Sequence, residues 1–456
     1  IEDLVFFDVE VFPNLFIIVY KLEGDNHKPV TLINPTPEQV GELFKFKLIG
    51  FNNRRYDNHI LYARYIGYTN EQLYNLSMRI IDSTSNGNLF REAYNLSYSD
   101  VYCFSNKKQS LKKFGIELGL HHQEFELPWN EPVAEDKWDS AAKYCANDTI
   151  ITEAVFHDRR ADWAARLILA ELTGGTPNNS TNQLVTKLIF GEDKSPELVY
   201  TDLSETFPGY EWKRLDDGRF RNMYRGDDVG FGGYVYAEPG IYTNVALLDV
   251  ASMHPTSLIE MNYFGKYTKN YEQIKNARVA IKHGDKITAS KMFNGMLTKY
   301  MSDDTIMEDL AYALKIALNS TYGLTSATFS NIMKHPKNVN NIVALRGALF
   351  MRTLQDEVQA KGYTVAHIKT DSIKIVNADK DIIDFCKEFS KKYGYEFEHE
   401  ATYEKICLVN DAVYIAKYGW SAKKQDIGKW TATGAQFQHP YVFKKLFTKE
   451  PVEFKD

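Results

Sequence analysis

Hydrophobic positions near the start of the chain follow strand patterns. The runs LVFFDVEVF, LFIIVYKL and PVTLI are rich in β-branched and aromatic residues, and they follow one another within residues 4–33. The later stretch SLKKFGIELGL and most of residues 136–172 have helical spacing with few helix breakers. Strands mixed with helices in this way predict an α/β unit that ends near residue 172.

The rest of the chain predicts a second unit with a different order of elements. The polar, turn-rich stretch TGGTPNNSTNQ at 173–183 is typical of a linker or loop. Further along, NVALLDV predicts a strand, and helical patterns follow at 266–300, through KIALNSTYG and near 339–361. A tight hairpin is expected around Asp371. These patterns indicate a multidomain protein of α/β and α+β class.

The composition is that of a folded protein with packed cores. At 456 residues, with 44% hydrophobic side chains, the chain is long enough for two or three domains. It has no uninterrupted apolar run of about 18 residues, so we expect no contact with a membrane. The four cysteines lie far apart without CxxC spacing, which favours reduced thiols over zinc ligands or disulfides. The first residue is Ile and no signal pattern follows it, so we expect a trimmed chain or fragment that works in the cytoplasm.

The distribution of charge matters more than the total. A net charge of −6 argues against nucleic acid as a partner. Residues 266–300, however, contain eight Lys or Arg against two Glu or Asp, a local charge of +6. This basic region would suit a substrate that carries phosphates. A solvated helical face is the alternative interpretation.

Two acids near the amino terminus indicate a cation site. Asp8 and Glu10 lie two positions apart in LVFFDVEVF, so on a strand their side chains share one face. Two like charges on a buried face are costly unless a cation binds them. We therefore expect a metal there, with an edge strand carrying solvated acids as the alternative.

Further acidic strings follow in the same region. Asp57 lies in GFNNRRYDNHI, behind Asn53, and KYCANDTIIT places Tyr144 and Asp148 at i and i+4 on one helical face. The strings DVE, NNRRYD and YCAND resemble the three motifs of DEDD exonucleases, in the tyrosine-containing form found in the proofreading domain of family B DNA polymerases.

That resemblance implies roles for the matching residues. Tyr144 would orient the attacking water, and Asn53 would contact the single strand. Lys112, between the second and third motifs, would be the basic residue near the scissile phosphate. Two divalent ions would be held by four acids: Asp8, Glu10, Asp57 and Asp148.

Three strings in the second half of the chain point to nucleotidyl transfer. They are DVASMHPTSL at 249–258, KIALNSTYG at 315–323 and HIKTDSIKI at 367–375. Carboxylates from two distant strands, Asp249 and Asp371, can hold two divalent ions on one phosphate. A helical lysine, here Lys315, can supply a cation for an incoming triphosphate. Taken alone, the NSTYG string could instead pack on a core helix.

In order, these strings resemble motifs A, B and C of family B DNA polymerases, close to the bacteriophage versions. The resemblance implies two Mg²⁺ per active site, replaceable by Mn²⁺, with the palm ions held by Asp249, Asp371 and the carbonyl of Val250. His254 would take the place of the aromatic ring that blocks a ribose 2′-hydroxyl. The implied nucleotide-binding residues are Ser252, His254, Lys315, Asn319 and Tyr322. The implied DNA-binding residues are Asn53, Gly232, Gly233, Gly323 and Tyr414.

Besides His254 in place of the family's aromatic residue, the chain departs from the family pattern at three places. The family motif Asp-Thr-Asp reads Lys369-Thr370-Asp371 here, which removes one carboxylate and adds a charge that two dications would repel. The string Asp411-Ala412-Val413-Tyr414 keeps the family tyrosine but lacks the lysine two residues before it. Gly230 stands at the tyrosine position of the YxGG segment. We expect activity to survive the change at Lys369, because in the family the second Asp is the bridging ligand and the first is more peripheral. At Gly230 we expect the strand tracking between the two sites to differ.

The resemblance also implies a domain layout. Only 42 residues follow Tyr414, so a thumb would be minimal or missing. The short intervals between the polymerase motifs leave little room for the insertions of protein-primed relatives, which favours a nucleic-acid primer. The expected parts are a ribonuclease H-like exonuclease domain at 1–172, a linker and strand-tracking region at 173–240, a palm formed by an antiparallel sheet with helices at 241–265 and 331–420, helical fingers at 266–330, and the start of a thumb or a truncated tail at 421–456.

The function expected from these motifs is DNA-templated DNA synthesis with 3′-5′ proofreading in phage replication. The partners would be primer-template DNA, dNTPs and a single-stranded 3′ end, with a monomeric enzyme in the host cytoplasm and possible replication accessory proteins. Two alternatives stay open. One is a 3′-5′ exonuclease whose polymerase-like half only binds primer-template, and the other is a nucleic-acid-binding replication factor, which would have no need of two acid clusters.

Overall fold

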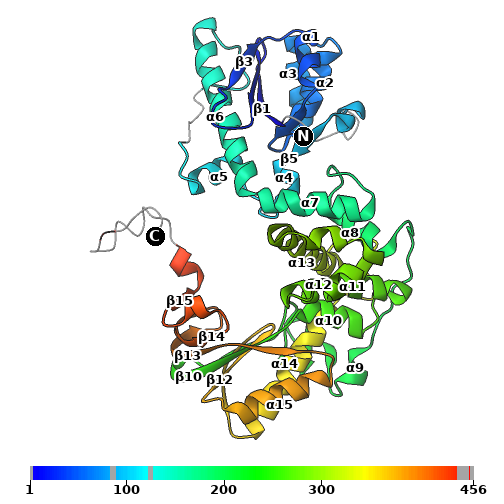
Figure 1. Cartoon of the computed structure of the whole chain (residues 1–456), viewed down its shortest axis with the longest axis vertical. Helices are drawn as coiled ribbons and strands as arrows, with labels where there is room; N and C mark the ends of the chain where they lie inside the picture. Colours follow the sequence, from blue (N-terminus) through cyan, green and yellow to red (C-terminus); the bar gives the residue numbers. More distant parts are fainter. Residues whose placement is uncertain (1–3, 83–88, 122–126, 439–450, 452–456) are drawn as a thin grey trace. The chain divides into compact units, whose positions relative to one another are not determined.

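The computed structural model describes residues 4–82, 89–121, 127–438 and 451 (Figure 1). The chain divides into two compact units. The first comprises Ile1–Leu188 and Ala280–Ala317, and the second comprises Ile189–Val279 and Leu318–Asp456. Within the described residues, no helix is both long enough and apolar enough to cross a membrane.

A five-stranded sheet forms the centre of the first unit, in the order β3-β2-β1-β4-β5. The predicted early strands are confirmed, and β1 is antiparallel to β2 and parallel to β4. In the second half of β1, buried residues alternate with half-buried ones. Hydrophobic spacing predicts this pattern for a strand with one packed face. The strands are β1 (Leu4–Val11), β2 (Phe16–Leu22), β3 (Val30–Ile33), β4 (Lys47–Gly50) and β5 (Tyr98–Asp100).

Helices pack on this sheet. The long helix α6 contacts β1 and β2, and Ala141, Ala142 and Cys145 on α6 enter one apolar cluster with Phe12 and Ile17. The helical stretch predicted at 136–172 is observed as two helices that meet at Arg159, whose backbone is not helical. The helices of the first unit are α1 (Pro37–Leu43), α2 (Asp57–Tyr65), α3 (Asn70–Ile81), α4 (Val101–Phe104), α5 (Leu111–Glu117), α6 (Trp138–Asp158), α7 (Arg160–Thr173), α8 (Thr181–Phe190), α12 (Lys286–Lys291) and α13 (Asp304–Ser326). Of these, α8 and α13 continue into the second unit.

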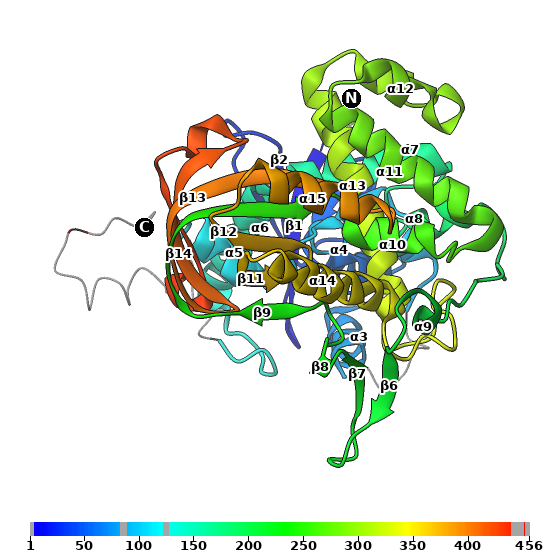
Figure 2. The same cartoon turned by 90° about the horizontal axis from the view of Figure 1, so that it is seen from below.

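A seven-stranded antiparallel sheet forms the centre of the second unit, in the order β15-β14-β13-β10-β12-β11-β9 (Figure 2). The central strand β10 pairs with β13 on one side and with β12 on the other. The predicted hairpin around Asp371 is confirmed as the β11–β12 turn. The strands are β9 (Val235–Ala237), β10 (Gly240–Val250), β11 (Thr364–Lys369), β12 (Ser372–Val376), β13 (Phe397–Asn410), β14 (Val413–Ser421) and β15 (Trp430–Thr433).

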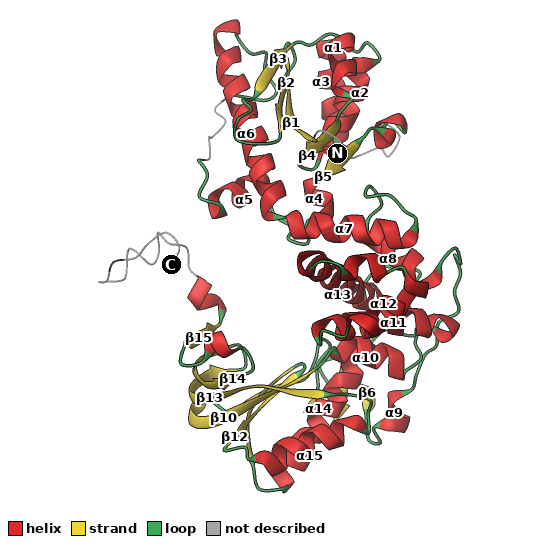
Figure 3. Ribbon diagram, viewed as in Figure 1, coloured by secondary structure: helices red, strands yellow, loops and turns green. Residues whose placement is uncertain are grey.

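Helices of the second unit cover parts of this sheet. Helix α14 contacts β11 (Figure 2), and α15 contacts β13. Figure 3 shows α14 and α15 beside the strands of this sheet. Gly347 on α14 lets α10 approach closely, because a Cβ at this position would lie 2.5 Å from the sulfur of Met253. The predicted helix near 339–361 is confirmed as α14. The helices are α9 (Leu203–Thr206), α10 (Met253–Glu260), α11 (Thr268–Lys282), α14 (Ile342–Ala360) and α15 (Lys380–Lys391).

The region 173–240 holds more structure than its weak sequence pattern indicates. After the loop at 174–180 it contains α8, α9 and a separate three-stranded sheet. The strands of this sheet are short and mostly exposed, so they leave little hydrophobic alternation in the sequence. They are β6 (Glu211–Arg214), β7 (Phe220–Tyr224) and β8 (Asp227–Asp228).

Candidate active sites

The first unit brings four predicted acids together. Asp8 and Glu10 project from one face of β1, Asp57 begins α2, and Asp148 lies on α6, which crosses β1. Burial, followed by the charges of Asp57, Glu10 and Asp148, raises the pKa of Asp8 well above its ordinary value. Burial, followed by the charges of Asp148 and Asp57, raises the pKa of Glu10 to about 8. The four carboxyl groups are therefore close enough to repel one another.

Residues around this acid cluster hold it in place. Burial raises the pKa of Tyr144, the charges of Asp148 and Glu10 add to the shift, and a hydrogen bond joins Tyr144 to Asp148. The thiol of Cys145 donates to Asp8 Oδ2 over 3.6 Å. Sequence reasoning missed Cys145, although it follows Tyr144 directly and its position on α6 faces the sheet.

Asn53 lies in a fixed loop rather than at the surface. It is 1% exposed, and its Nδ2 donates to Asn58 Oδ1 over 2.9 Å. The buried carboxylate of Asp100, which sequence reasoning missed, accepts hydrogen bonds from the backbone N–H groups of Asn52 and Arg54. In this conformation Asn53 offers no surface to a strand, whereas Lys112 is exposed on α5.

The second unit places Asp249 beside Asp371. Asp249 is near the end of β10 and pairs in register with Ser372, and the backbone N–H of Val250 donates to the carbonyl of Asp371 over 2.8 Å. Burial, followed by the charge of Asp371, raises the pKa of Asp249 to about 8. Burial also raises the pKa of Asp371. Antiparallel pairing thus joins two acids that lie more than 120 positions apart in the sequence.

Two further acids reach this pair from β13. The charges of Glu400 and Glu398 both raise the pKa of Asp249, and that of Glu400 also raises the pKa of Asp371. Asp249 pairs in register with Glu398, and a register shift at Leu247/Leu248 inserts an extra residue on β13. Sequence reasoning missed both glutamates. Their spacing in FEHEA is the same i, i+2 pattern that identified Asp8 and Glu10.

The donor chemistry of both clusters fits Mg²⁺ or Mn²⁺. Every side chain in them offers carboxylate oxygens, which these ions prefer, and a dication would offset the repulsion that raises the pKa values. Among the described residues, no group of three or more His, Cys, Asp or Glu side chains already has a metal-binding arrangement.

The predicted nucleotide-binding residues lie on two helices. Lys315, Asn319 and Gly323 are exposed along one face of α13, with the half-buried Tyr322 beside them. The ring of Tyr322 stacks on His254 of α10, with ring centroids 4.1 Å apart and planes at 11°. Burial lowers the pKa of His254 to about 4, so its imidazole is neutral at pH 7.

A basic side chain that sequence reasoning did not single out lies near the start of α10. Arg278 on α11 donates to Ser252 Oγ over 3.5 Å, and the charge of Glu398 acts on it. Ser252 has a left-handed backbone, with φ of 53°, which turns the chain from β10 into α10. Arg278 belongs to the basic region 266–300, so the local charge was the signal for it.

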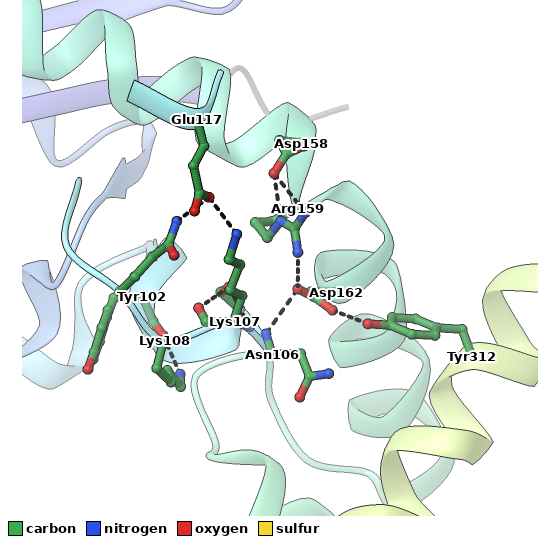
Figure 4. Close-up of polar contacts among 11 residues, drawn as sticks. Tyr102, Asn106, Lys107, Lys108, Glu117, Asp158, Arg159, Asp162 and Tyr312 are labelled. Atoms are coloured by element: carbon green, nitrogen blue, oxygen red, sulfur yellow. Dashed lines mark hydrogen bonds and ion pairs between the residues drawn. The ribbon is translucent and has the colours of Figure 1, made fainter. Parts of the chain in front are cut away.

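A polar network in the first unit fixes the helix that carries Lys315 (Figure 4). Tyr312, three residues before Lys315 on α13, donates to the buried carboxylate of Asp162 over 2.6 Å. Asp162 also accepts from the backbone N–H of Asn106 over 2.9 Å. Lys107, next along that loop, pairs with Glu117. The network ties α13 to α7 within the first unit.

The glycine segment lies against the hairpin of Asp371. A Cβ at Gly233 would lie 2.8 Å from the side chain of Thr370, and its φ of +132° also favours glycine. The backbone N–H of Thr370 donates to the carbonyl of Tyr234. Gly232 is exposed, and Tyr414 is half-buried on β14.

Comparison with known proteins supports the fold. No family model matches the sequence, and no curated protein matches it. The structure of the family B DNA polymerase from the hyperthermophilic archaeon Pyrobaculum calidifontis is similar, with a TM-score of 0.51 and 14% sequence identity. The match covers 99% of this chain and 63% of the archaeal chain, so this chain spans less than two thirds of it. The protein thus has a multidomain fold like that of a family B DNA polymerase.

Proposed function

We propose that the protein is a DNA-templated DNA polymerase that adds dNTPs to a primer 3′ end and proofreads with a 3′-5′ exonuclease, in phage DNA replication. The observation that carries the proposal is that Asp249, near the end of β10, lies beside Asp371 in the β11–β12 turn, where the backbone N–H of Val250 donates to the carbonyl of Asp371 over 2.8 Å. Two carboxylates on such a sheet match the requirement of two-metal phosphoryl transfer. The fold likeness to a family B DNA polymerase supports the same function.

In this proposal Asp249, Asp371 and the carbonyl of Val250 would hold two Mg²⁺ ions, which would supply positive charge for the transferred phosphoryl group and the primer hydroxyl. Lys315 and Arg278 bind the triphosphate through their positive charges. The stacked rings of His254 and Tyr322 form a flat, neutral wall for the sugar and base of the incoming nucleotide.

The acid cluster of the first unit would remove mismatched nucleotides. Asp8, Glu10, Asp57 and Asp148 would hold two further ions there. Tyr144, already hydrogen-bonded to Asp148, positions the attacking water. Substrates are a single-stranded 3′ end at this cluster and primer-template DNA with dNTPs at the second cluster. The enzyme works as a monomer in the cytoplasm of the bacterial host.

Primer extension with and without dNTPs tests the proposal. A labelled primer-template should lengthen with dNTPs, and a labelled single strand should shorten without them. Asp249→Ala and Asp371→Ala should each abolish extension and leave shortening, because each removes an ion ligand from the second unit only. Near wild-type extension by either variant would overturn the assignment.

A nuclease whose polymerase-like half only binds DNA is the second candidate. The exposed Lys369 at the end of β11 stands where the resembling family has an acid, and the lysine expected before Tyr414 is missing. Shortening by the wild-type protein, without any extension over a range of Mg²⁺ and Mn²⁺ concentrations, would favour this candidate.

A further inference from the structure

Lys374 is a buried cation beside the acids of the second unit. It lies on β12, where it pairs in register with Leu247 of β10 and His367 of β11, and its side chain is 2% exposed. Because Ser372 pairs with Asp249 and lies two positions from Lys374, Lys374 and Asp249 belong to the same face of the sheet. A buried ammonium is costly unless nearby groups compensate it.

The partners that hold Lys374 are neutral. Its Nζ donates to Nδ1 of His367 over 2.9 Å and lies 4.7 Å from the ring centroid of Tyr414. The other ring nitrogen of His367 lies 2.9 Å from the carbonyl of Asp411, so it is the protonated one, and Nδ1 is free to accept.

A buried lysine elsewhere in the chain shows the contrast. Lys21, 6% exposed, forms a direct ion pair with Glu153 and also donates to two backbone carbonyls. The carboxylate of Glu153 neutralises the charge of Lys21 directly, which suits a structural role. The charge of Lys374 instead acts on Asp249 and Asp371, where it offsets a small part of the rise in the pKa of both. Burial lowers the pKa of Lys374 to about 8, so the ammonium remains the main form at pH 7.

We propose that Lys374 is a positioning residue whose fixed positive charge weakens divalent-ion binding by Asp249 and Asp371 until a nucleotide triphosphate arrives. The four acids of this cluster would otherwise attract two dications strongly without substrate. An ammonium held by His367 and Tyr414 stays near the acids, so it repels the ions as long as no nucleotide offsets its charge. The triphosphate then supplies negative charge that offsets the charge of Lys374, so that both dications bind. This inference rests on the proposed function for the role of the nucleotide.

Direct ion binding tests the inference without relying on activity. The measurement is Mn²⁺ affinity from the electron paramagnetic resonance signal of free Mn²⁺, with no nucleotide present. The full chain carries Asp8→Asn and Glu10→Gln, which removes ion binding at the first cluster. Lys374→Met should bind Mn²⁺ about fivefold more tightly than this background, since a unit charge is removed near a double one. Lys374→Arg should stay within about twofold of it, because the charge is kept.

Further variants identify the site and the cause. Adding Asp371→Asn should abolish the tight binding, which places it at the second cluster. Lys361→Met is the matched control, because Lys361 also packs over an aromatic ring, that of Phe385, at the end of α14. It should leave Mn²⁺ affinity unchanged. With a dideoxy-terminated primer-template and dNTP present, the gain of Lys374→Met should shrink to less than about twofold.

Several outcomes would overturn the inference. Unchanged or weaker Mn²⁺ binding by a folded Lys374→Met variant would reduce Lys374 to a packing residue. If that variant does not fold, Lys374→Gln, which can still donate to His367, takes its place with the same expectation. If neither Lys374→Met nor Lys374→Gln folds while Lys374→Arg does, the inference is also overturned, because the sheet would then need the positive charge in order to fold. A wild-type protein that never extends primers, combined with tighter binding by Lys374→Met, would refute only the polymerase function.

Discussion

Replacing Asp249 by Asn should stabilise the metal-free protein while abolishing DNA synthesis. Burial, followed by the charges of Asp371, Glu400 and Glu398, raises the pKa of Asp249 in the folded state to about 8, against an ordinary value of 3.8. A carboxyl whose folded pKa is raised destabilises the fold as pH rises, because the unfolded chain releases the proton first. The penalty is absent below pH 4, grows between pH 4 and 8, and is complete above pH 8.

The size of the effect follows from the shift. At pH 7 the 3.2 units between pH and the ordinary pKa correspond to about 4 kcal/mol. Asp249 is only partly buried, so solvent screening reduces this to about 2 kcal/mol. For a unit of roughly 230 residues, that free energy corresponds to a rise in melting temperature of about 4–8 °C.

Differential scanning calorimetry in EDTA measures this change. Asp249→Asn should raise the melting temperature of one transition at pH 7 and leave it unchanged near pH 4. Asp381→Asn, an exposed acid-to-amide change on α15 of the same unit, is the matched control and should stay within about 0.5 kcal/mol of wild type. Excess Mg²⁺ should stabilise wild type more than the variant, because bound ions relieve the same repulsion. If Asp249→Asn is as stable as wild type, or less stable, in EDTA at pH 7, the conclusion that the charged acid cluster destabilises the fold is refuted.

The remaining predictions concern the two activities. Asp8→Ala with Glu10→Ala should stop the shortening of a labelled single strand and leave primer extension, and retained shortening would remove both residues from the nuclease site. His254→Ala should lower the ratio of kcat/KM for dCTP over CTP by about tenfold or more, roughly 1.4 kcal/mol of discrimination, and an unchanged ratio would assign the sugar gate to another residue. Lys369→Asp should lower the Mg²⁺ concentration for half-maximal extension. An unchanged or higher Mg²⁺ requirement would contradict the hypothesis that Lys369 is merely tolerated beside the metal ions.

Local patterns were sufficient for the strands and for the acids that lie on them. The spacing of LVFFDVEVF predicts β1 and places Asp8 and Glu10 on one face, because side chains alternate along any strand. The same reasoning applied to FEHEA would have found Glu398 and Glu400. Asp57 and Asp148, in contrast, come from other elements, so only the motif resemblance could associate them with β1.

Residues that depend on the pairing of distant strands could not be found from spacing. Lys374 becomes notable only because β12 lies between β10 and β11, which sets it beside His367 and on the face of Asp249. The stack of His254 on Tyr322 joins two helices in the same way. Hydrophobic periodicity reports which side of an element is buried, and it says nothing of what that side meets.

The position of the second acid cluster in the sheet explains how the fold tolerates it. Asp249 lies on β10, which pairs along most of its length with β13 and β12. The buried residues on either side, Leu248 and Val250, anchor the strand while the acids repel one another. A sheet that served only as support would be more stable with uncharged residues at these positions. In the proposed function, cations bound by these acids would offset their repulsion, and the charge of Lys374 would set how readily those cations are held.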